Sequence, residues 1–162
     1  MTEIPTNLQL TQVPIVKAEI LIRKPVREVF EAFVDPAVTS KFWFTKGSGR
    51  LEVGTTVHWE WEMYDISVPV DVKAIEQDRR ILVEWPGAGA QHTVEWLFTP
   101  YGDATTWVTI ANTGFVGTGD EVVSQALDST GGFTFTLAGL KAWLEHGIQL
   151  NLVQDHTPPG DA

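Results

Sequence analysis

The stretch GGFTFTLAGLKAWLEHGIQLNL, residues 131–152, decides the fold, because it is the one segment long enough to form a helix that covers a sheet. At 100° per residue its largest apolar side chains fall within a narrow sector of such a helix. They are Phe133, Leu137, Leu140, Leu144 and Ile148, with Trp143 at the edge of the sector. The pattern predicts an amphipathic helix that buries one face.

The segments before this helix are short, and their apolar residues alternate with polar ones, which is typical of half-buried strands. The predicted strands are residues 15–23, 56–63, 67–74, 81–85, 92–99 and 105–113. Turn sequences such as Pro86-Gly87 separate them, so consecutive strands are expected to pair antiparallel.

Helical spacing returns at two other places. Pro25 opens the segment PVREVFEAFV, where Pro is suited to the first turn of a helix. Pro36 ends that helix or begins a second short one through Lys41. Later, Asp120 is a plausible N-cap for a separate helix that ends before Gly131-Gly132.

This order of elements predicts an α+β fold of the helix-grip type. A curved antiparallel sheet of six or seven strands wraps on the long C-terminal helix, and two short helices follow the first strand. We divide the chain into an N-terminal arm (1–14), one helix-grip domain (15–153) and a C-terminal tail (154–162).

Charge and composition exclude several classes of protein. With 11 Lys+Arg against 21 Asp+Glu, the net charge of −10 disfavours nucleic acid and anionic membranes as partners. The chain has no Cys, no apolar run that could span a bilayer and no secretory signal, so we expect a cytoplasmic protein. Its four His lack the spacing of metal ligands, and nucleotide-binding motifs are missing; we expect no metal and no cofactor.

Four stretches carry a family resemblance: residues 22–43 (IRKPVREVFEAFVDPAVTSKFW), 49–61, 94–115 and 131–147. They resemble the activator of heat-shock protein 90 ATPase homologue-like family, within the START, polyketide cyclase and Bet v-like (SRPBCC) superfamily. The resemblance implies a cavity between sheet and C-terminal helix, which many relatives use for apolar ligands, and it transfers no catalytic residue. Cochaperone activity is not implied, because the eukaryotic cochaperone has a further N-terminal domain that 14 residues cannot supply.

The aromatic side chains are the candidate lining of this cavity. Trp59, Trp61, Trp96 and Phe98 would face the helix, where they either pack as core or border a ligand. Trp43 lies in the aromatic group Phe42-Trp43-Phe44, expected near the cavity mouth as a plug or a gate. The predicted lining is Trp43, Trp59, Trp61, Val70, Trp96, Phe98, Phe133, Leu137, Leu140 and Leu144.

Three functions agree with the sequence. The leading hypothesis is binding of a small hydrophobic or aromatic molecule, without catalysis. The second is a cyclase- or hydrolase-like enzyme that uses a cavity acid, with Glu84, Glu95, Asp71 and Asp65 as candidates. The third is a protein-interaction module resembling the heat-shock protein 90 activator.

A second apolar stripe on the last helix points away from the first. It consists of Phe135, Ala138 and Ala142, with Leu150 beyond them. A homodimer contact would cover it, and so would the N-terminal arm. We favour the homodimer.

Overall fold

The computed structural model describes residues 8–159; residues 1–7 of the predicted arm and 160–162 of the predicted tail lie outside the described residues. Residues 8–15 have no regular secondary structure. The elements are β1 (Val16–Ile22), α1 (Val26–Val34), α2 (Pro36–Thr39), β2 (Lys46–Gly47), β3 (Thr56–Trp61), the 3-10 turn η1 (Glu62–Tyr64), β4 (Ile66–Glu76), β5 (Arg80–Pro86), β6 (Gln91–Pro100), β7 (Thr106–Thr113), α3 (Gly119–His146) and α4 (Leu152–Asp155).

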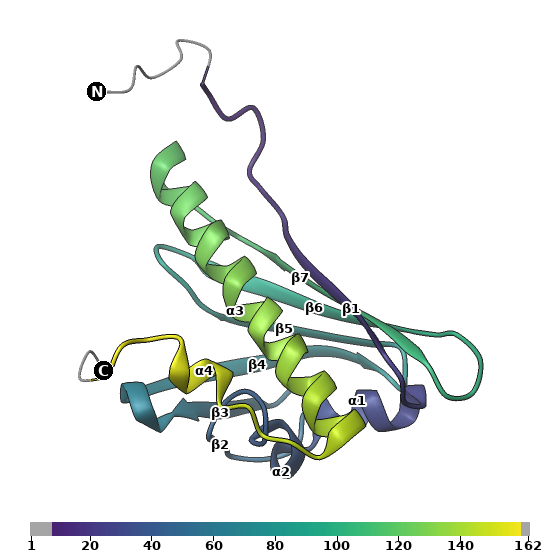
Figure 1. Ribbon diagram of the computed structural model, residues 1–162. Helices are drawn as coiled ribbons and strands as arrows, with labels where there is room; N and C mark the ends of the chain where they lie inside the picture. Colours follow the sequence, from purple (N-terminus) through teal and green to yellow (C-terminus); the bar gives the residue numbers. More distant parts are fainter. Residues whose placement is uncertain (1–7, 160–162) are drawn as a thin grey trace.

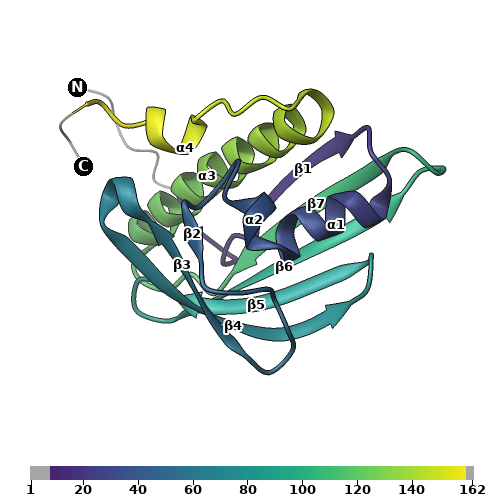
Figure 2. The same ribbon diagram turned by 90° about the horizontal axis from the view of Figure 1, so that it is seen from below.

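The seven strands form one sheet in the order β1-β7-β6-β5-β4-β3-β2, and every neighbouring pair is antiparallel. The sheet curves around α3, with α1 and α2 at one end of its concave side (Figures 1 and 2). The predicted helix-grip fold is thereby confirmed. The alternation behind it holds in β6, where Val94, Trp96 and Phe98 are buried.

The prediction of two separate helices around Gly131-Gly132 was wrong. A single helix, α3, runs from Gly119 to His146 and passes through both glycines. Its N-cap is Thr118, whose hydroxyl accepts a hydrogen bond from the Glu121 amide at 3.2 Å; Asp120 lies inside the first turn. Each internal Gly costs a helix about 1 kcal/mol relative to Ala, and the packing of the buried face outweighs that cost.

The helix also ends earlier than its apolar pattern suggests. Gly147 adopts a left-handed conformation (φ 65°), and its amide donates to the Trp143 carbonyl at 2.9 Å. Such a C-cap is easy for Gly, which has no Cβ, and it turns the chain away from the helix axis. Ile148 therefore leaves the predicted stripe and is 51% exposed.

The C-terminal half of α3 is fixed to the end of β1. Lys141 Nζ donates to the Leu21 carbonyl at 2.8 Å and to Glu145 Oε2 at 2.7 Å. Glu145 Oε2 also accepts from the Arg23 amide at 2.8 Å. Burial raises the pKa of Glu145, but the bonds from Arg23 and Lys141 lower it more, so the carboxylate stays ionised below its ordinary range.

The outer stripe of α3 meets the C-terminal segment of the same chain. The Phe135 ring lies 5.7 Å from His156, which follows α4. Tyr64 in η1 holds this segment in place, because its hydroxyl donates a hydrogen bond to the Val153 carbonyl at 2.5 Å and lies 3.1 Å from Thr157 Oγ1. Helix α4 spans the boundary drawn between residues 153 and 154.

Shortening a buried side chain of α3 tests how much its packing stabilises the fold. Leu140 is fully buried, so Leu140→Ala should lower the free energy of unfolding by about 2–5 kcal/mol. The same substitution at Leu97, which is 37% exposed on β6, should change it by about 0.5 kcal/mol or less. Urea unfolding followed by circular dichroism measures both. Equal losses would show that α3 is not packed as described.

Candidate ligand cavity

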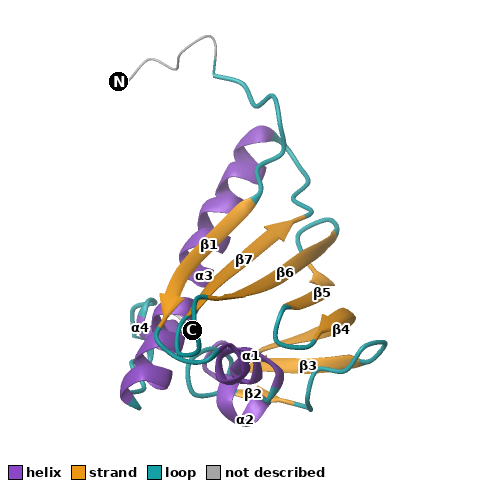
Figure 3. Ribbon diagram, turned by 90° about the vertical axis from the view of Figure 1, so that its right-hand side faces the viewer, coloured by secondary structure: helices purple, strands orange, loops and turns teal. Residues whose placement is uncertain are grey.

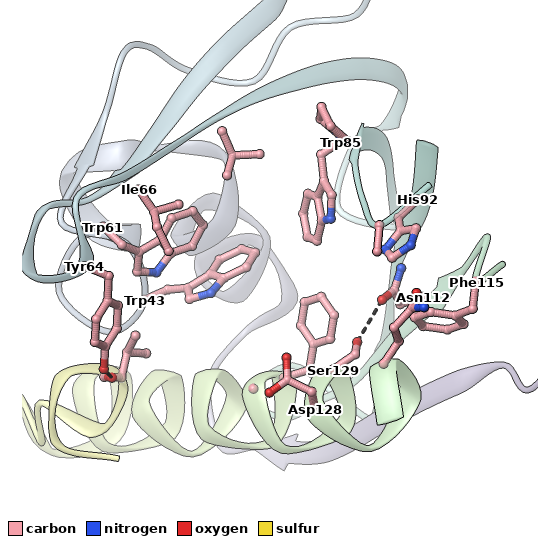
Figure 4. A pocket seen from close by; sticks show the side chains of 17 residues that line it. Trp43, Trp61, Tyr64, Ile66, Trp85, His92, Asn112, Phe115, Asp128 and Ser129 are labelled. Atoms are coloured by element: carbon pink, nitrogen blue, oxygen red, sulfur yellow. Dashed lines mark hydrogen bonds between the residues drawn. The ribbon is translucent and has the colours of Figure 1, made fainter. Parts of the chain in front are cut away.

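A cavity of about 480 Å³ lies between the N-terminal half of α3 and the concave side of the sheet. Its size is within the range of pockets for small organic ligands, about 300–1,000 Å³. Figure 4 shows the side chains around it. The lining residues are Trp43, Trp61, Tyr64, Ile66, Val68, Trp85, Pro86, Ala88, His92, Asn112, Phe115, Gln125, Asp128, Ser129, Gly132, Phe133 and Val153.

The apolar wall of the cavity is a group of aromatic rings around Trp43. The Trp43 ring centroid lies 5.8 Å from that of Trp61 and 5.9 Å from that of Phe133. Trp85 stacks on Phe133 with centroids 6.1 Å apart and ring planes 22° apart. Behind Trp43, Trp59 packs edge-on at 5.0 Å. These rings come from the segment after α2, from strands β3 and β5 and from α3, so the wall exists only once α3 lies over the sheet.

A hydrogen-bonded pair joins β7 to α3 beside the cavity. Asn112 is only 2% exposed, and its amide nitrogen donates to the Thr93 carbonyl at 3.1 Å. Its Oδ1 accepts from Ser129 Oγ at 2.8 Å, the bond drawn in Figure 4. A buried amide is costly without partners, and here both ends are satisfied.

His92 on β6 is a lining side chain whose pKa the fold shifts. It is buried, and burial lowers the pKa of its imidazole below the ordinary value, which favours the neutral ring. The Phe115 ring packs edge-on at 5.0 Å. Nε2 has no hydrogen-bond partner within residues 8–159. The ring lies against Gly87, where a Cβ would come within 2.3 Å of Nε2, so a larger residue at position 87 would require the His92 ring to move.

The structure divides the residues predicted from sequence into two groups. Trp43, Trp61 and Phe133 line the cavity. The others lie beneath it or to one side: Trp59, Val70, Trp96, Phe98, Leu137 and Leu140 are buried in the core, and Leu144 is partly buried against it. Their part in binding a ligand stays a prediction.

Helix α1 is the physical reason for this division. It packs against β6, with Phe30 5.4 Å from Phe98 and Phe33 5.7 Å from Trp96. The alternation of β6 shows which side chains face inward, but not that α1 fills that part of the concave surface. The open part of the concave surface lies beside the N-terminal half of α3.

Four lining residues were not predicted from the sequence: Trp85, His92, Asn112 and Ser129. A signal existed for three of them. Trp85 continues the inward alternation of Ile81 and Val83, and His92 continues that of the following residues of β6. Asn112 occupies an inward position of β7, where a polar residue is unusual. Ser129 carried no signal, because it lies on a helix whose course was not predicted.

The four acids considered for catalysis lie elsewhere. Glu84 pairs with Lys73 at 3.7 Å, and Glu95 accepts from Arg80 at 2.7 Å. Asp71 accepts from the Thr56 hydroxyl, and Asp65 is exposed in a turn. None of the four lines the cavity, whose one carboxylate among the described residues is that of Asp128.

Residues 8–159 contain no cluster of three or more His, Asp or Glu side chains placed to hold a metal ion. In the same range, helices long and apolar enough to cross a membrane are absent.

Comparison with known proteins places the chain in a family. The family model for "Activator of Hsp90 ATPase homolog 1-like protein" matches residues 23–145. The chain belongs to this family. The match covers every strand except β1 and nearly all of α3, which are the elements around the cavity. A search of curated proteins found no match.

Solved structures extend this likeness. Protein SSP2350 from Staphylococcus saprophyticus is 29% identical, with a TM-score of 0.72 over 85% of this chain and 96% of that one. The Aha1 dimer from Colwellia psychrerythraea is 16% identical (TM-score 0.69; 83% and 98%). A START superfamily protein from Mycobacterium smegmatis is 12% identical (TM-score 0.60; 80% and 98%). The last two show the shared START-like fold.

The lowered pKa of His92 predicts a pH dependence of stability. His92 binds a proton more readily in the unfolded chain than in the folded one. The contribution of the neutral His92 to the free energy of unfolding is therefore complete above the ordinary pKa of about 6.5 and is lost as pH falls below it. Replacing His92 with Gln should therefore flatten the fall in unfolding free energy between pH 7.5 and 5.5. Urea titrations at several pH values measure this. His58→Gln, at an exposed His, is the matched control and should keep the wild-type slope; a wild-type slope in His92→Gln would contradict the assignment.

Proposed function

We propose that this protein binds a small hydrophobic or aromatic molecule in the cavity between α3 and the sheet. The observation that carries the proposal is a space of about 480 Å³ bordered by three indole rings and Phe133. Apolar surface of this kind gains free energy by leaving water, at about 25 cal/mol per Å². The START-like fold, whose members commonly hold such ligands, supports the same function.

One observation favours a second candidate, a cyclase- or hydrolase-like enzyme. His92 is buried and its lowered pKa favours the neutral ring, so it could act as a general base on a bound molecule, and Asp128 supplies the one carboxylate of the described lining. Turnover separates the two candidates. Mass spectrometry of a ligand before and after incubation would show a new mass for an enzyme and an unchanged mass for a binding protein.

Filling the cavity from α3 tests the binding proposal. Gly132 lines the cavity on the same helix face as Ser129 and Gln125, and a Cβ built on it meets nothing within 4 Å. Gly132→Leu should place its side chain in the space and weaken binding of the uncharged fluorescent probe N-phenyl-1-naphthylamine by about tenfold or more. Fluorescence titration measures the affinity.

Gly131→Leu is the matched control. Gly131 is equally unobstructed and adjacent in the helix, but it does not line the cavity, so the probe should bind as in the wild type. Both substitutions raise helix propensity by about the same amount, which keeps folding comparable. Wild-type affinity in Gly132→Leu would contradict the proposal, as would a wild-type protein that leaves the probe fluorescence unchanged. Native mass spectrometry of the purified protein would reveal a ligand that co-purifies.

We further propose that the chain forms a homodimer. Large apolar side chains remain exposed at the N-terminal end of α3 and in the segment before β1, among them Leu127 (70%), Leu8 and Leu10. The relative from Colwellia psychrerythraea is described as a dimer. Multi-angle light scattering should give twice the 18.0 kDa mass of the chain at micromolar concentration. Leu127→Glu should shift the mass toward one chain, and a wild-type mass of 18.0 kDa would contradict the proposal.

A further inference from the structure

The two ends of the cavity differ in chemistry, and this difference indicates which ligands fit. Figure 4 shows Trp43, Trp61 and Ile66 at one end, and His92 and Ser129 at the other. A ligand that fills the cavity therefore meets aromatic rings with one part and polar groups with the other. The inference rests on the proposed binding function and concerns the ligand's polar part.

The polar end has more unused acceptors than donors. The amide nitrogen of Asn112 is committed to the Thr93 carbonyl, and the Ser129 hydroxyl hydrogen to Asn112 Oδ1. The Ser129 oxygen keeps its capacity to accept. Gln125 Nε2 donates to the Val116 carbonyl at 3.1 Å, which leaves its Oε1 buried and without a partner in residues 8–159.

His92 adds one more unsatisfied atom. Its Nε2 is buried without a partner among the described residues, and the neutral ring that burial favours has one donor and one acceptor nitrogen. Buried polar atoms of native proteins usually have partners. Three side-chain atoms of residues 8–159 have none: two belong to the lining residues His92 and Gln125, and the third, Trp96 Nε1, lies in the core. The two lining atoms indicate a place where a ligand group completes the hydrogen bonding.

The charge of the lining is negative. Asp128, which is exposed to solvent, is the only charged side chain among the lining residues of the described chain, and no Lys or Arg accompanies it. A carboxylate or phosphate on a ligand would lose its water and meet another anion, which is unfavourable on both counts. A hydroxyl or amide N–H instead meets acceptors.

We propose that the cavity selects aromatic molecules that carry an uncharged hydrogen-bond donor and rejects aromatic anions. The indole wall receives the rings, and the end formed by His92, Gln125 and Ser129 receives the donor. Asp128 excludes negative charge. The ligand class is thus neutral hydroxy- or amide-bearing aromatics, as distinct from fatty acids or aromatic acids.

Three probes that share one ring system test this selection. Naphthalene has no polar group, 2-naphthamide has a neutral donor, and 2-naphthoate has nearly the same shape with a negative charge. Displacement of N-phenyl-1-naphthylamine at pH 7 gives their relative affinities for the full chain. We expect 2-naphthamide to bind about tenfold more tightly than either of the others.

Asp128→Asn removes the charge alone. It should strengthen binding of 2-naphthoate several-fold and leave naphthalene unchanged. Asp120→Asn is the control, because Asp120 is exposed on the same helix, as Asp128 is, but does not line the cavity; it should leave all three affinities at wild-type values.

The outcomes separate the two proposals. If 2-naphthoate binds the wild type as tightly as 2-naphthamide, the selection is refuted while ligand binding stands. Equal affinities for naphthalene and 2-naphthamide would refute the role of the donor. If none of the three probes displaces the dye, and the dye itself does not bind, the binding function fails and the selection with it.

Discussion

The packing of α3 along β1 is the contact on which the rest of the structure depends. The hydrogen bonds from Lys141 and to Glu145 fix the C-terminal half of the helix to the end of this strand. Gly139 lets α3 approach the chain after α2, since a Cβ there would lie 3.1 Å from the Phe42 carbonyl oxygen. The helix is thus fixed at one end, and the sheet curves away from β1 beneath it (Figure 3).

The cavity follows from how the remaining concave surface is covered. Near the C-terminal half of α3, α1 supplies Phe30 and Phe33 and fills the space with aromatic side chains. Toward the N-terminal half of α3 the space is bordered by Tyr64 and by Val153 of α4, and Gly132 has no side chain to fill it. Large rings on a curved surface then border a space that they cannot close.

The same arrangement explains why polar residues are kept inside. Asn112 and Ser129 hydrogen bond across the space between β7 and α3, so they hold the helix at a set distance where apolar packing is thin. Two of the three buried side-chain atoms without a partner in residues 8–159, His92 Nε2 and Gln125 Oε1, belong to residues that line the cavity. A protein that needed only stability would gain from replacing them with apolar groups. Their presence agrees with a site that a ligand completes.

Much of the fold could be predicted from the chain alone, because period-2 and period-3.6 patterns are local properties. The strands of residues 92–99 and 105–113 and the helix after Pro25 follow directly from alternation and from proline. The course of α3 could not be predicted, since the glycines at 131 and 132 favour a break and only tertiary packing overrides them. The end of α3 at Gly147, in contrast, follows a local signal, because Gly readily adopts the left-handed conformation that ends a helix.

For the candidate site, the sequence by itself determined that aromatic side chains face the helix, because alternation in a strand fixes which residues share a face. It did not determine which of them border open space. Trp96 and Trp61 have the same signal, yet α1 buries the first and leaves the second at the cavity. The tertiary structure also brings three polar residues together at one end of the cavity: His92, Asn112 and Ser129. They come from β6, β7 and α3, and their separation depends on how α3 packs against the sheet.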